Sequence, residues 1–520
     1  MKYNIINPII SWVIKKRINR INNFVKFPIK TQKELLKYLI KKSENTIWGE
    51  KHNFKEIKTY KDFNKNVPVQ SYEDIKLNID LIKKGTENLF WPTKIFSFAK
   101  SSGTTGDKSK FIPITKESLN KCHLRAGQDL LSIYVNNFPK TKIFSGKSLM
   151  IGGSNEIERN SKISSGDLSS ILIDNLPIWT QLISTPKKEI ALLSNWEEKI
   201  EKIISEVIYQ DVRSISGVPS WTILLLEKIL KKTKKKKIIE IWPNLELFMH
   251  GGISIEPYKN SFEKIIGKNI NYIEIYNASE GFFAIQNNIN KNDLLLMLDY
   301  GIFYEFIPIE NNKETTSIIP LEKVKKNKNY AMVISTNGGL WRYKIGDTVK
   351  FTSINPYKII ITGRTKHYIN AFGEEIMVHN TDLAIKIASE ETNSVVKEYT
   401  AAPKFLNNHS GCHEWIIEFE IAPKNINKFI TILDLKLQEI NSDYEAKRSK
   451  DLLLKKPEVH IANKNFFYEW LKKRDKLGGQ NKIPRLQNNR EKIDELLNFL
   501  RKKKYYLFYL FYVTMFLLRN

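Results

Sequence analysis

The chain has 520 residues, with 42% hydrophobic and 27% charged side chains, a composition typical of a globular protein with more than one domain. Its formal net charge is +27, but the lysines are spread along the whole chain. No RNA-recognition, zinc-finger or helix-turn-helix pattern accompanies them, so we do not expect nucleic acid as a partner. The two cysteines, Cys122 and Cys412, form no C-x-x-C pair, which argues against a disulfide framework or a zinc site and favours a reducing cytoplasm.

The N-terminal segment, residues 1–25, mixes apolar side chains with basic ones: Lys15, Lys16, Arg17 and Arg20. It lacks the uninterrupted apolar core and the cleavage site of a signal peptide, and an amphipathic helix lying on the large domain fits it better. A second helical pattern follows at residues 31–42. The segments 45–49 and 67–72 have the composition of loops and turns.

A stretch rich in hydroxyl groups and glycine, Ser-Ser-Gly-Thr-Thr-Gly, occupies residues 101–106 between two hydrophobic runs. Glycines let backbone N–H groups turn toward a ligand, hydroxyls add donors, and Lys100, Lys108 and Lys110 add positive charge, which together suit a phosphate group. The spacing does not match a Walker A motif, which excludes a P-loop NTPase. A flexible surface loop is the alternative for this stretch taken alone.

Helical and strand patterns alternate after this stretch. Helices are expected at 116–135 and 195–208, and a third opens from the segment 214–221 and runs to about residue 232. Strands are expected at 147–153, 245–252 and 270–276. This alternation predicts α/β layers with a substantial parallel sheet. Gly251 and Gly252 end one strand, where the absence of side chains lets a flat ligand approach the backbone.

A second motif, Tyr-Asn-Ala-Ser-Glu-Gly at residues 276–281, ends a predicted strand. Because α/β sheets bind ligands at the carboxyl ends of their strands, the aromatic ring of Tyr276 is well placed to stack on a base. The carboxylate of Glu280 is a suitable oxygen ligand for Mg²⁺, together with ATP phosphates and water. A plain turn with a solvated glutamate is the alternative.

A third motif follows the predicted strands at 299–308 and 330–336. It reads Leu-Trp-Arg-Tyr-Lys-Ile-Gly-Asp at residues 340–347. Asp347, directly after a glycine, is able to accept hydrogen bonds from both ribose hydroxyls. A single Gly-Asp pair is more often a turn, so the prediction depends on the three motifs together.

Together, these three motifs resemble those of the Gretchen-Hagen (auxin-responsive promoter) acyl acid–amido synthetases, within the adenylate-forming superfamily of acyl-CoA synthetases and luciferases. The likeness runs from near the N-terminus to about residue 500 and is closest to bacterial members. Plant members usually carry arginine where Lys344 stands here, and lysine loses the guanidinium fork.

The resemblance implies an α/β protein with a large multi-sheet N-terminal adenylation domain at 1–363 and a smaller, mobile α+β lid domain at 364–500. It also implies two half-reactions on Mg-ATP. A carboxylic acid first becomes an acyl-adenylate with release of pyrophosphate, and an amine, usually that of an amino acid, then displaces AMP to form an amide. Coenzyme A as acceptor is one alternative, and a non-catalytic protein that binds anionic surfaces is another. We expect a cytoplasmic monomer.

By the same resemblance, ATP is bound by Ser101, Ser102, Gly103, Thr104, Thr105, Tyr276, Ser279, Asp347 and Arg364. The hydroxyl-rich loop is expected to hold the phosphates, Tyr276 to pack on adenine and Asp347 to bind ribose. Glu280 is expected to bind Mg²⁺ as a catalytic residue. The other catalytic residue, Lys482, lies in a Lys-x-Pro-Arg element that lid rotation would bring to the α-phosphate. The acyl pocket is expected along the segments 123–129 and 213–221, with Arg125, Val218 and Trp221 as substrate-binding residues.

The lid is expected to hold helices at 381–390 and 426–441 and a strand at 415–421. A basic and then hydrophobic tail, residues 501–520, ends the chain. Its apolar run at 505–518 is shorter than the ~20 residues that a membrane-spanning helix needs. Two readings stay open: weak peripheral contact with an anionic membrane, and an extension that packs weakly.

Overall fold

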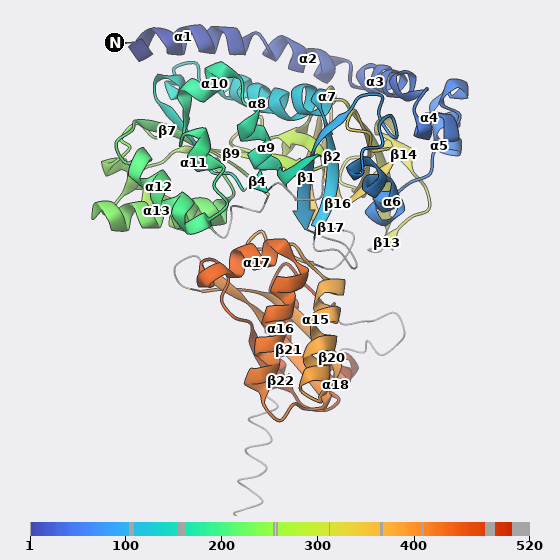
Figure 1. The fold of residues 1–520 in the computed structure, drawn as a ribbon, viewed down its shortest axis with the longest axis vertical. Coiled ribbons are helices and arrows are strands. Elements are labelled where there is room, and N and C mark those ends of the chain that lie inside the picture. Colours follow the sequence, from blue (N-terminus) through green and yellow to red (C-terminus); the bar gives the residue numbers. More distant parts are fainter. Residues whose placement is uncertain are drawn as a thin grey trace, which may run out of the picture. The chain divides into compact units, whose positions relative to one another are not determined.

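The computed structural model describes residues 2–102, 109–153, 155–156, 163–252, 255, 258–310, 313–364, 368–406, 410–473 and 484–501. The chain forms two compact units. The larger contains residues up to 101 and from 110 to 365, and the smaller contains Ser102, Ser109 and the residues after 365 (Figure 1). The predictions for Gly103, Thr104, Thr105 and Lys482, and for most of the tail, lie outside the described residues.

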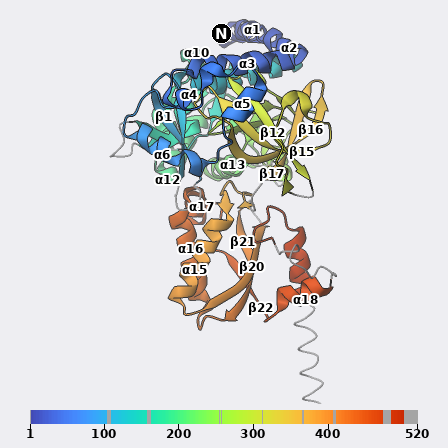
Figure 2. The same ribbon diagram turned by 90° about the vertical axis from the view of Figure 1, so that its right-hand side faces the viewer.

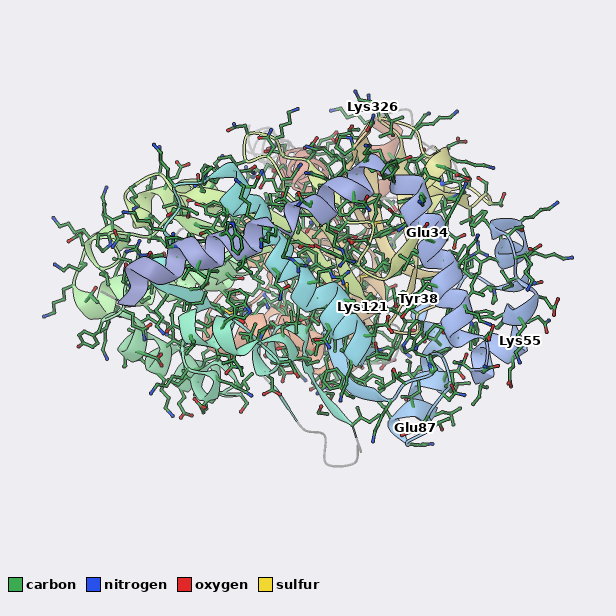
Figure 3. All side chains as sticks on the ribbon, turned by 90° about the horizontal axis from the view of Figure 1, so that it is seen from above. Glu34, Tyr38, Lys55, Glu87, Lys121 and Lys326 are labelled. Atoms are coloured by element: carbon green, nitrogen blue, oxygen red, sulfur yellow. The ribbon has the colours of Figure 1, made fainter. Side chains whose placement is uncertain are left out.

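The N-terminal segment forms helices rather than one amphipathic helix. Along one side of the larger unit run α1 (Lys2–Lys15), α2 (Ile18–Lys26) and α3 (Pro28–Ser43) (Figure 1, Figure 3). The helices that follow are α4 (Ile47–Lys51), α5 (Tyr60–Asn66) and α6 (Tyr72–Lys83). The loop predicted at 45–49 is therefore wrong in its second half, because the Thr46 hydroxyl accepts a 2.9 Å hydrogen bond from the Gly49 N–H and caps α4.

A small sheet carries the strand that leads into the hydroxyl-rich stretch. Its order is β2 (Ser109–Thr115), β1 (Ile95–Ser102), β5 (Ser164–Asp167) and β4 (Asn155–Glu156). Strands β1 and β5 are parallel, and Lys100 lies opposite Asp167. The C-terminal end of β1 is thus fixed beside an aspartate of another strand.

A large mixed sheet forms the centre of the larger unit. Its antiparallel part runs in the order β13 (Lys313–Glu314), β12 (Ile302–Glu310), β15 (Asn329–Thr336), β16 (Tyr343–Ile354), β17 (Tyr357–Arg364), β11 (Leu294–Leu296), β10 (Gly281–Ile285) and β9 (Asn271–Ala278), with β14 (Ile319–Pro320) beside β12. The predicted parallel part continues from β9 through β8 (Leu247–Gly251), β7 (Val212–Gly217), β3 (Lys147–Met150) and β6 (Ser184–Thr185).

Helices bury both faces of the parallel part, as is usual for parallel sheets. Leu247 and Met249 belong to the buried cluster that includes α8 (Leu124–Asn137), which follows α7 (Lys116–Ser118) and a π-helical segment at 119–123. Phe248 points the other way, into a second cluster. The helices of that cluster are α12 (Trp196–Val207), α13 (Pro219–Thr233) and α14 (Lys259–Ile266). The other described α-helices of the larger unit are α9 (Leu168–Asp174), α10 (Ile178–Ile183) and α11 (Lys188–Ala191).

The smaller unit is built on a three-stranded sheet, which Figure 2 shows with α15 and α16 on one side and α18 on the other. The strands are β20 (Val395–Phe405), β21 (Gly411–Ile421) and β22 (Glu458–Ala462), preceded by the pair β18 (Tyr368–Ile369) and β19 (Ile376–Met377). The helices are α15 (Val378–Glu391), α16 (Ile426–Ile440), α17 (Ser442–Arg448) and α18 (Phe466–Lys473). The predicted fold class, a large multi-sheet α/β part followed by a smaller α+β part, is confirmed. Among the described residues, no helix has the length and hydropathy needed to cross a bilayer.

Candidate active site

The carboxyl ends of neighbouring parallel strands meet at one edge of the large sheet. Gly217 of β7 lies opposite His250 of β8, and Gly251 lies opposite Ile275 of β9. Directly beyond these ends stand Val218, Gly252 and the turn after β9. Open α/β sheets bind their ligands at this edge, so the structure places the second motif where a ligand site is expected.

The turn that carries Glu280 contacts the end of β1. Ala278 pairs with Gly281, so Ser279 and Glu280 form a two-residue turn between β9 and β10. The Ser279 hydroxyl donates a 3.3 Å hydrogen bond to the carbonyl oxygen of Lys100, the residue before Ser101. The second motif therefore contacts the strand that leads into the first. The side chain of Ser102 lies outside what the structure describes.

A buried hydrogen bond joins the second motif to the third. The Tyr276 phenol donates to Asp347 Oδ2 at 2.8 Å, and both side chains are buried. The Tyr276 ring packs against Phe283, with 4.8 Å between the ring centroids. Across the β16–β17 pair, Asp347 lies opposite Arg364, whose side chain is outside the described part. The backbones of these predicted ATP-binding residues thus share one region.

A β-bulge in β16 lies beside Asp347. The register between β15 and β16 shifts between Ala331, which faces Thr348, and Val333, which faces Lys344. Gly346 lies within this bulge at φ +88°, and a Cβ there would meet nothing within 4 Å. Glycine is needed for its backbone conformation and not for space, and bulges of this kind re-aim the neighbouring side chain.

A buried ion pair anchors the start of β16. The Arg342 guanidinium donates to both carboxylate oxygens of Glu305 at 2.9 Å, and the two side chains are only 3% and 1% exposed. It also donates to the Val67 carbonyl at 2.7 Å. Burial and the Glu305 carboxylate raise the pKa of the Tyr60 phenol, which donates to Glu305. We did not predict this pair from the sequence, where its signal is a charged residue between two aromatic ones.

Lys199 of α12 is a second residue that the sequence did not point to. Its ammonium donates to the carbonyl oxygens of Gly152 and Gly153, at 3.3 and 2.9 Å, just beyond β3. Burial lowers the pKa of Lys199 to about 8, and the Asp167 carboxylate opposes that effect. Gly153 lies so close to Asp167 that a Cβ would come within 1.8 Å of its Oδ2. Because Asp167 faces Lys100, these contacts connect the ends of β3 and β1.

The predicted acyl-binding residues lie in different surroundings. Val218 precedes α13 at the strand edge, and Trp221 lies in the first turn of that helix. Arg125 of α8 donates instead to the carbonyl oxygen of Asp299, at 3.0 Å. The three roles stay predictions. Lys344 forms a 2.5 Å ion pair with Glu314.

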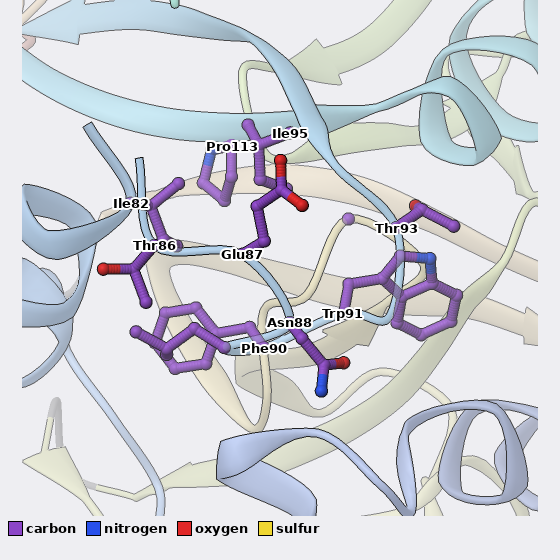
Figure 4. A pocket seen from close by; sticks show the side chains of 11 residues that line it. Ile82, Thr86, Glu87, Asn88, Phe90, Trp91, Thr93, Ile95 and Pro113 are labelled. Carbon is purple, nitrogen blue, oxygen red and sulfur yellow. The ribbon is translucent and has the colours of Figure 1, made fainter. Parts of the chain in front are cut away.

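A separate pocket lies beside the segment that precedes β1. Figure 4 shows Glu87 pointing toward Ile95 and Pro113 across this pocket. Its lining residues are Ile82, Thr86, Glu87, Asn88, Leu89, Phe90, Trp91, Thr93, Ile95, Pro113 and Gly338. None of the predicted site residues lines it, so it is distinct from the strand-end site.

The smaller unit contains a group with metal-ligand side chains, Glu414, Glu458 and His460. Lys404 already lies 2.6 Å from Glu458 and 3.4 Å from Glu414, and Arg490 lies 2.6 Å from Glu414. These cations, with the hydrogen bond from His460, hold the pKa of Glu414 at about 2 despite its burial. Lysine and arginine side chains therefore already balance the carboxylate charges, and the group is an ion-pair network.

Comparisons with known proteins agree with this architecture. Residues 17–270 match the GH3 family N-terminal domain, residues 295–364 its central domain and residues 379–491 its C-terminal domain. The chain is 23% identical over 405 residues to indole-3-acetic acid-amido synthetase GH3.4 of Arabidopsis thaliana, covering 65% of this chain and 67% of that protein. It is 22% identical over 388 residues to jasmonoyl--L-amino acid synthetase JAR4 of Nicotiana attenuata, covering 62% and 66%.

Solved structures share the fold. AtGH3.15 acyl acid amido synthetase in complex with 2,4-DB is 17% identical, covers 92% of this chain and 94% of its own, and has a TM-score of 0.58. A 2-hydroxyisobutyryl-CoA ligase is 13% identical, covers 91% and 92%, and has a TM-score of 0.55. The predicted closeness to bacterial members stays a prediction. The chain therefore belongs to the GH3 family and has the fold of acyl acid amido synthetases and other adenylate-forming ligases.

Proposed function

We propose that this chain is an ATP-dependent ligase that activates a carboxylic acid as an acyl-adenylate and transfers the acyl group to the amine of an amino acid. The observation that supports this most directly is the pair of contacts that gathers the motifs: Tyr276 with Asp347, and Ser279 with Lys100. Membership of the GH3 family, whose relatives named above are amido synthetases, supports the same reaction.

The chemistry depends on positioning and on neutralising phosphate charge. In our proposal, Ser101, Ser102, Gly103, Thr104 and Thr105 hold the phosphates, Tyr276 packs on adenine, Asp347 binds ribose, and Ser279 and Arg364 complete the ATP site. Glu280 holds Mg²⁺, which suits a carboxylate in a partly exposed turn beside the end of β1. When bound, Mg²⁺ neutralises the charge that develops on the phosphates.

The other parts of the proposal concern the substrates and the lid. Lys482 on a mobile lid serves the adenylation step, and Val218, Trp221 and Arg125 contribute to acyl binding. The strand-edge position of Val218 and Trp221 supports their part in this site. The free, buried cysteines, Cys122 and Cys412, support a cytoplasmic location, and we propose that the protein acts as a monomer.

ATP–pyrophosphate exchange across a panel of carboxylic acids tests the first half-reaction. We expect exchange to require one class of acid, and Glu280→Ala to lower its rate about 100-fold or more, because the metal ligand is lost. Glu189→Ala, which changes an exposed glutamate of α11, is the matched control and keeps the wild-type rate. Absence of exchange with every acid would contradict the proposal.

A second assay identifies the acceptor. The enzyme receives its acid and Mg-ATP with either a mixture of amino acids or coenzyme A, and the products are identified by mass spectrometry. We expect an amide with an amino acid. A thioester as the main product would instead favour an acyl-CoA ligase, as one of the structural neighbours is named.

A further inference from the structure

Helix α1 is attached to the larger unit through one of its faces. Ile14 is buried, and its carbonyl oxygen accepts a 2.9 Å hydrogen bond from the Ser132 hydroxyl of α8. The Asn7 side chain donates to the Thr141 carbonyl at 3.0 Å and accepts from the Phe144 N–H at 3.1 Å. These contacts fix the helix and leave its outer face uninvolved in packing.

The outer face of α1 is also apolar. Ile9, Trp12 and Val13 are 57%, 63% and 52% exposed, and their spacing puts them on one face of the helix. A surface helix normally turns polar side chains outward, but each of these three residues is apolar and more than half exposed. A grouped set of exposed apolar side chains of this kind marks an interaction surface.

The end of α1 is basic, with Lys15 as its last residue and Lys16 directly after it. No aspartate or glutamate precedes Glu34 in the sequence. Of the nearby basic residues, Arg17 and Arg20 form ion pairs with Asp129 and Asp299. Neither Lys15 nor Lys16 forms an ion pair with another described residue. The Lys16 ammonium lies 3.4 Å from the centroid of the Trp12 ring, so cationic and aromatic groups project together.

We propose that the outer face of α1 docks on an anionic lipid membrane. Ile9, Trp12 and Val13 would enter the boundary between headgroups and acyl chains, while Lys15 and Lys16 contact lipid phosphates. Aromatic residues flanked by lysines are typical of interfacial helices, and each lysine near an anionic surface adds to binding. A second copy of the chain fits less well, because a two-fold contact through this face would oppose the same basic residues. The inference is independent of the proposed reaction.

Co-sedimentation with vesicles tests it, using phosphatidylcholine alone and phosphatidylcholine mixed with phosphatidylglycerol. We expect the full chain to bind the anionic vesicles and Ile9→Gln/Trp12→Gln/Val13→Gln to weaken binding about tenfold or more, without a change in thermal midpoint. Leu77→Gln/Tyr209→Gln is the matched control, because it removes exposed apolar side chains from α6 and from the segment after α12.

Two charge-reversal variants test whether binding depends on the lysines of α1 or only on the overall positive charge of the protein. Lys15→Glu/Lys16→Glu is expected to weaken binding about tenfold or more, and Lys55→Glu/Lys326→Glu, at positions that Figure 3 shows away from α1, is expected to leave it unchanged. Absence of binding by the wild-type chain overturns the proposal. So does unchanged binding by the α1 variants, which would assign the lipid contact to another segment such as the tail. Self-association abolished by the α1 variants would make a second copy the occupant.

Discussion

At the residue scale, Arg342 anchors the start of β16, the strand that contains Asp347. Its guanidinium fork pairs with Glu305 away from water, so removing the arginine leaves a buried carboxylate without its cation. We expect Arg342→Met to lower the free energy of unfolding by about 3–5 kcal/mol, measured by urea denaturation. Arg20→Met, which breaks the half-exposed ion pair with Asp299, is the control and should cost about 1 kcal/mol or less. Equal losses in the two variants would contradict this account.

Lys199 gives a pH-dependent prediction. Since burial lowers its pKa to about 8 from 10.5, the unfolded state binds more protons between these values, and the stability contributed by this group rises with pH across that window. Below pH 8 the charged form costs about 3 kcal/mol at most. We therefore expect the unfolding free energy of the wild type, minus that of Lys199→Met, to become more positive from pH 8 to pH 10. Lys202→Met, on the exposed side of α12, should show a constant difference.

The residues found from sequence differ in kind from those that were missed. Tyr276, Glu280 and Asp347 lie in short motifs whose members are neighbours in the chain. Lys199 and Arg342 act through partners at distant chain positions, and only the tertiary fold brings these together. A charged side chain inside an apolar pattern indicates a buried polar contact, but the sequence does not show which residue is its partner.

At the element scale, the bulge in β16 requires glycine for its backbone conformation and not for the space around it. Gly346 and Gly127 both have room for a Cβ, but only Gly346 has a positive φ. We expect Gly346→Ala to lower stability by about 1–2 kcal/mol and to reduce the ATP–pyrophosphate exchange rate, because the strained bulge no longer holds Asp347 in place. Gly127→Ala, within α8, should raise stability by about 0.5–1 kcal/mol. Unchanged stability and exchange in Gly346→Ala would remove the proposed role of the bulge.

The parallel strands and their helices were predictable because each strand and the helix that follows it are local patterns. The prediction of α12 from residues 195–208 rested on such a pattern, and Asn195 caps the helix by accepting from the Glu198 N–H at 3.0 Å. The antiparallel part was not predictable in the same way. β11 pairs with both β10 and β17, and the second partner lies far along the chain, so its position depends on packing rather than on periodicity.

At the scale of the whole molecule, the two units bury separate cores. The clusters around the large sheet contain residues up to Ile359, and those of the smaller unit begin at Ile369. We therefore expect two unfolding steps in calorimetry. Arg342→Met should lower one step, and Arg448→Met, which breaks the buried pair with Asp434, should lower the other.

Mg-ATP then shows which unit holds the nucleotide, because Tyr276, Glu280 and Asp347 all belong to the larger one. A ligand that binds only the folded state stabilises it by about 2.7 kcal/mol at 100 times its dissociation constant. We expect Mg-ATP to raise the midpoint of the step that Arg342→Met lowers. Asp347→Asn should reduce this shift while leaving the other step in place, because the amide loses the carboxylate that accepts from ribose. A shift confined to the step that Arg448→Met lowers would place the nucleotide in the smaller unit and refute the site proposed here.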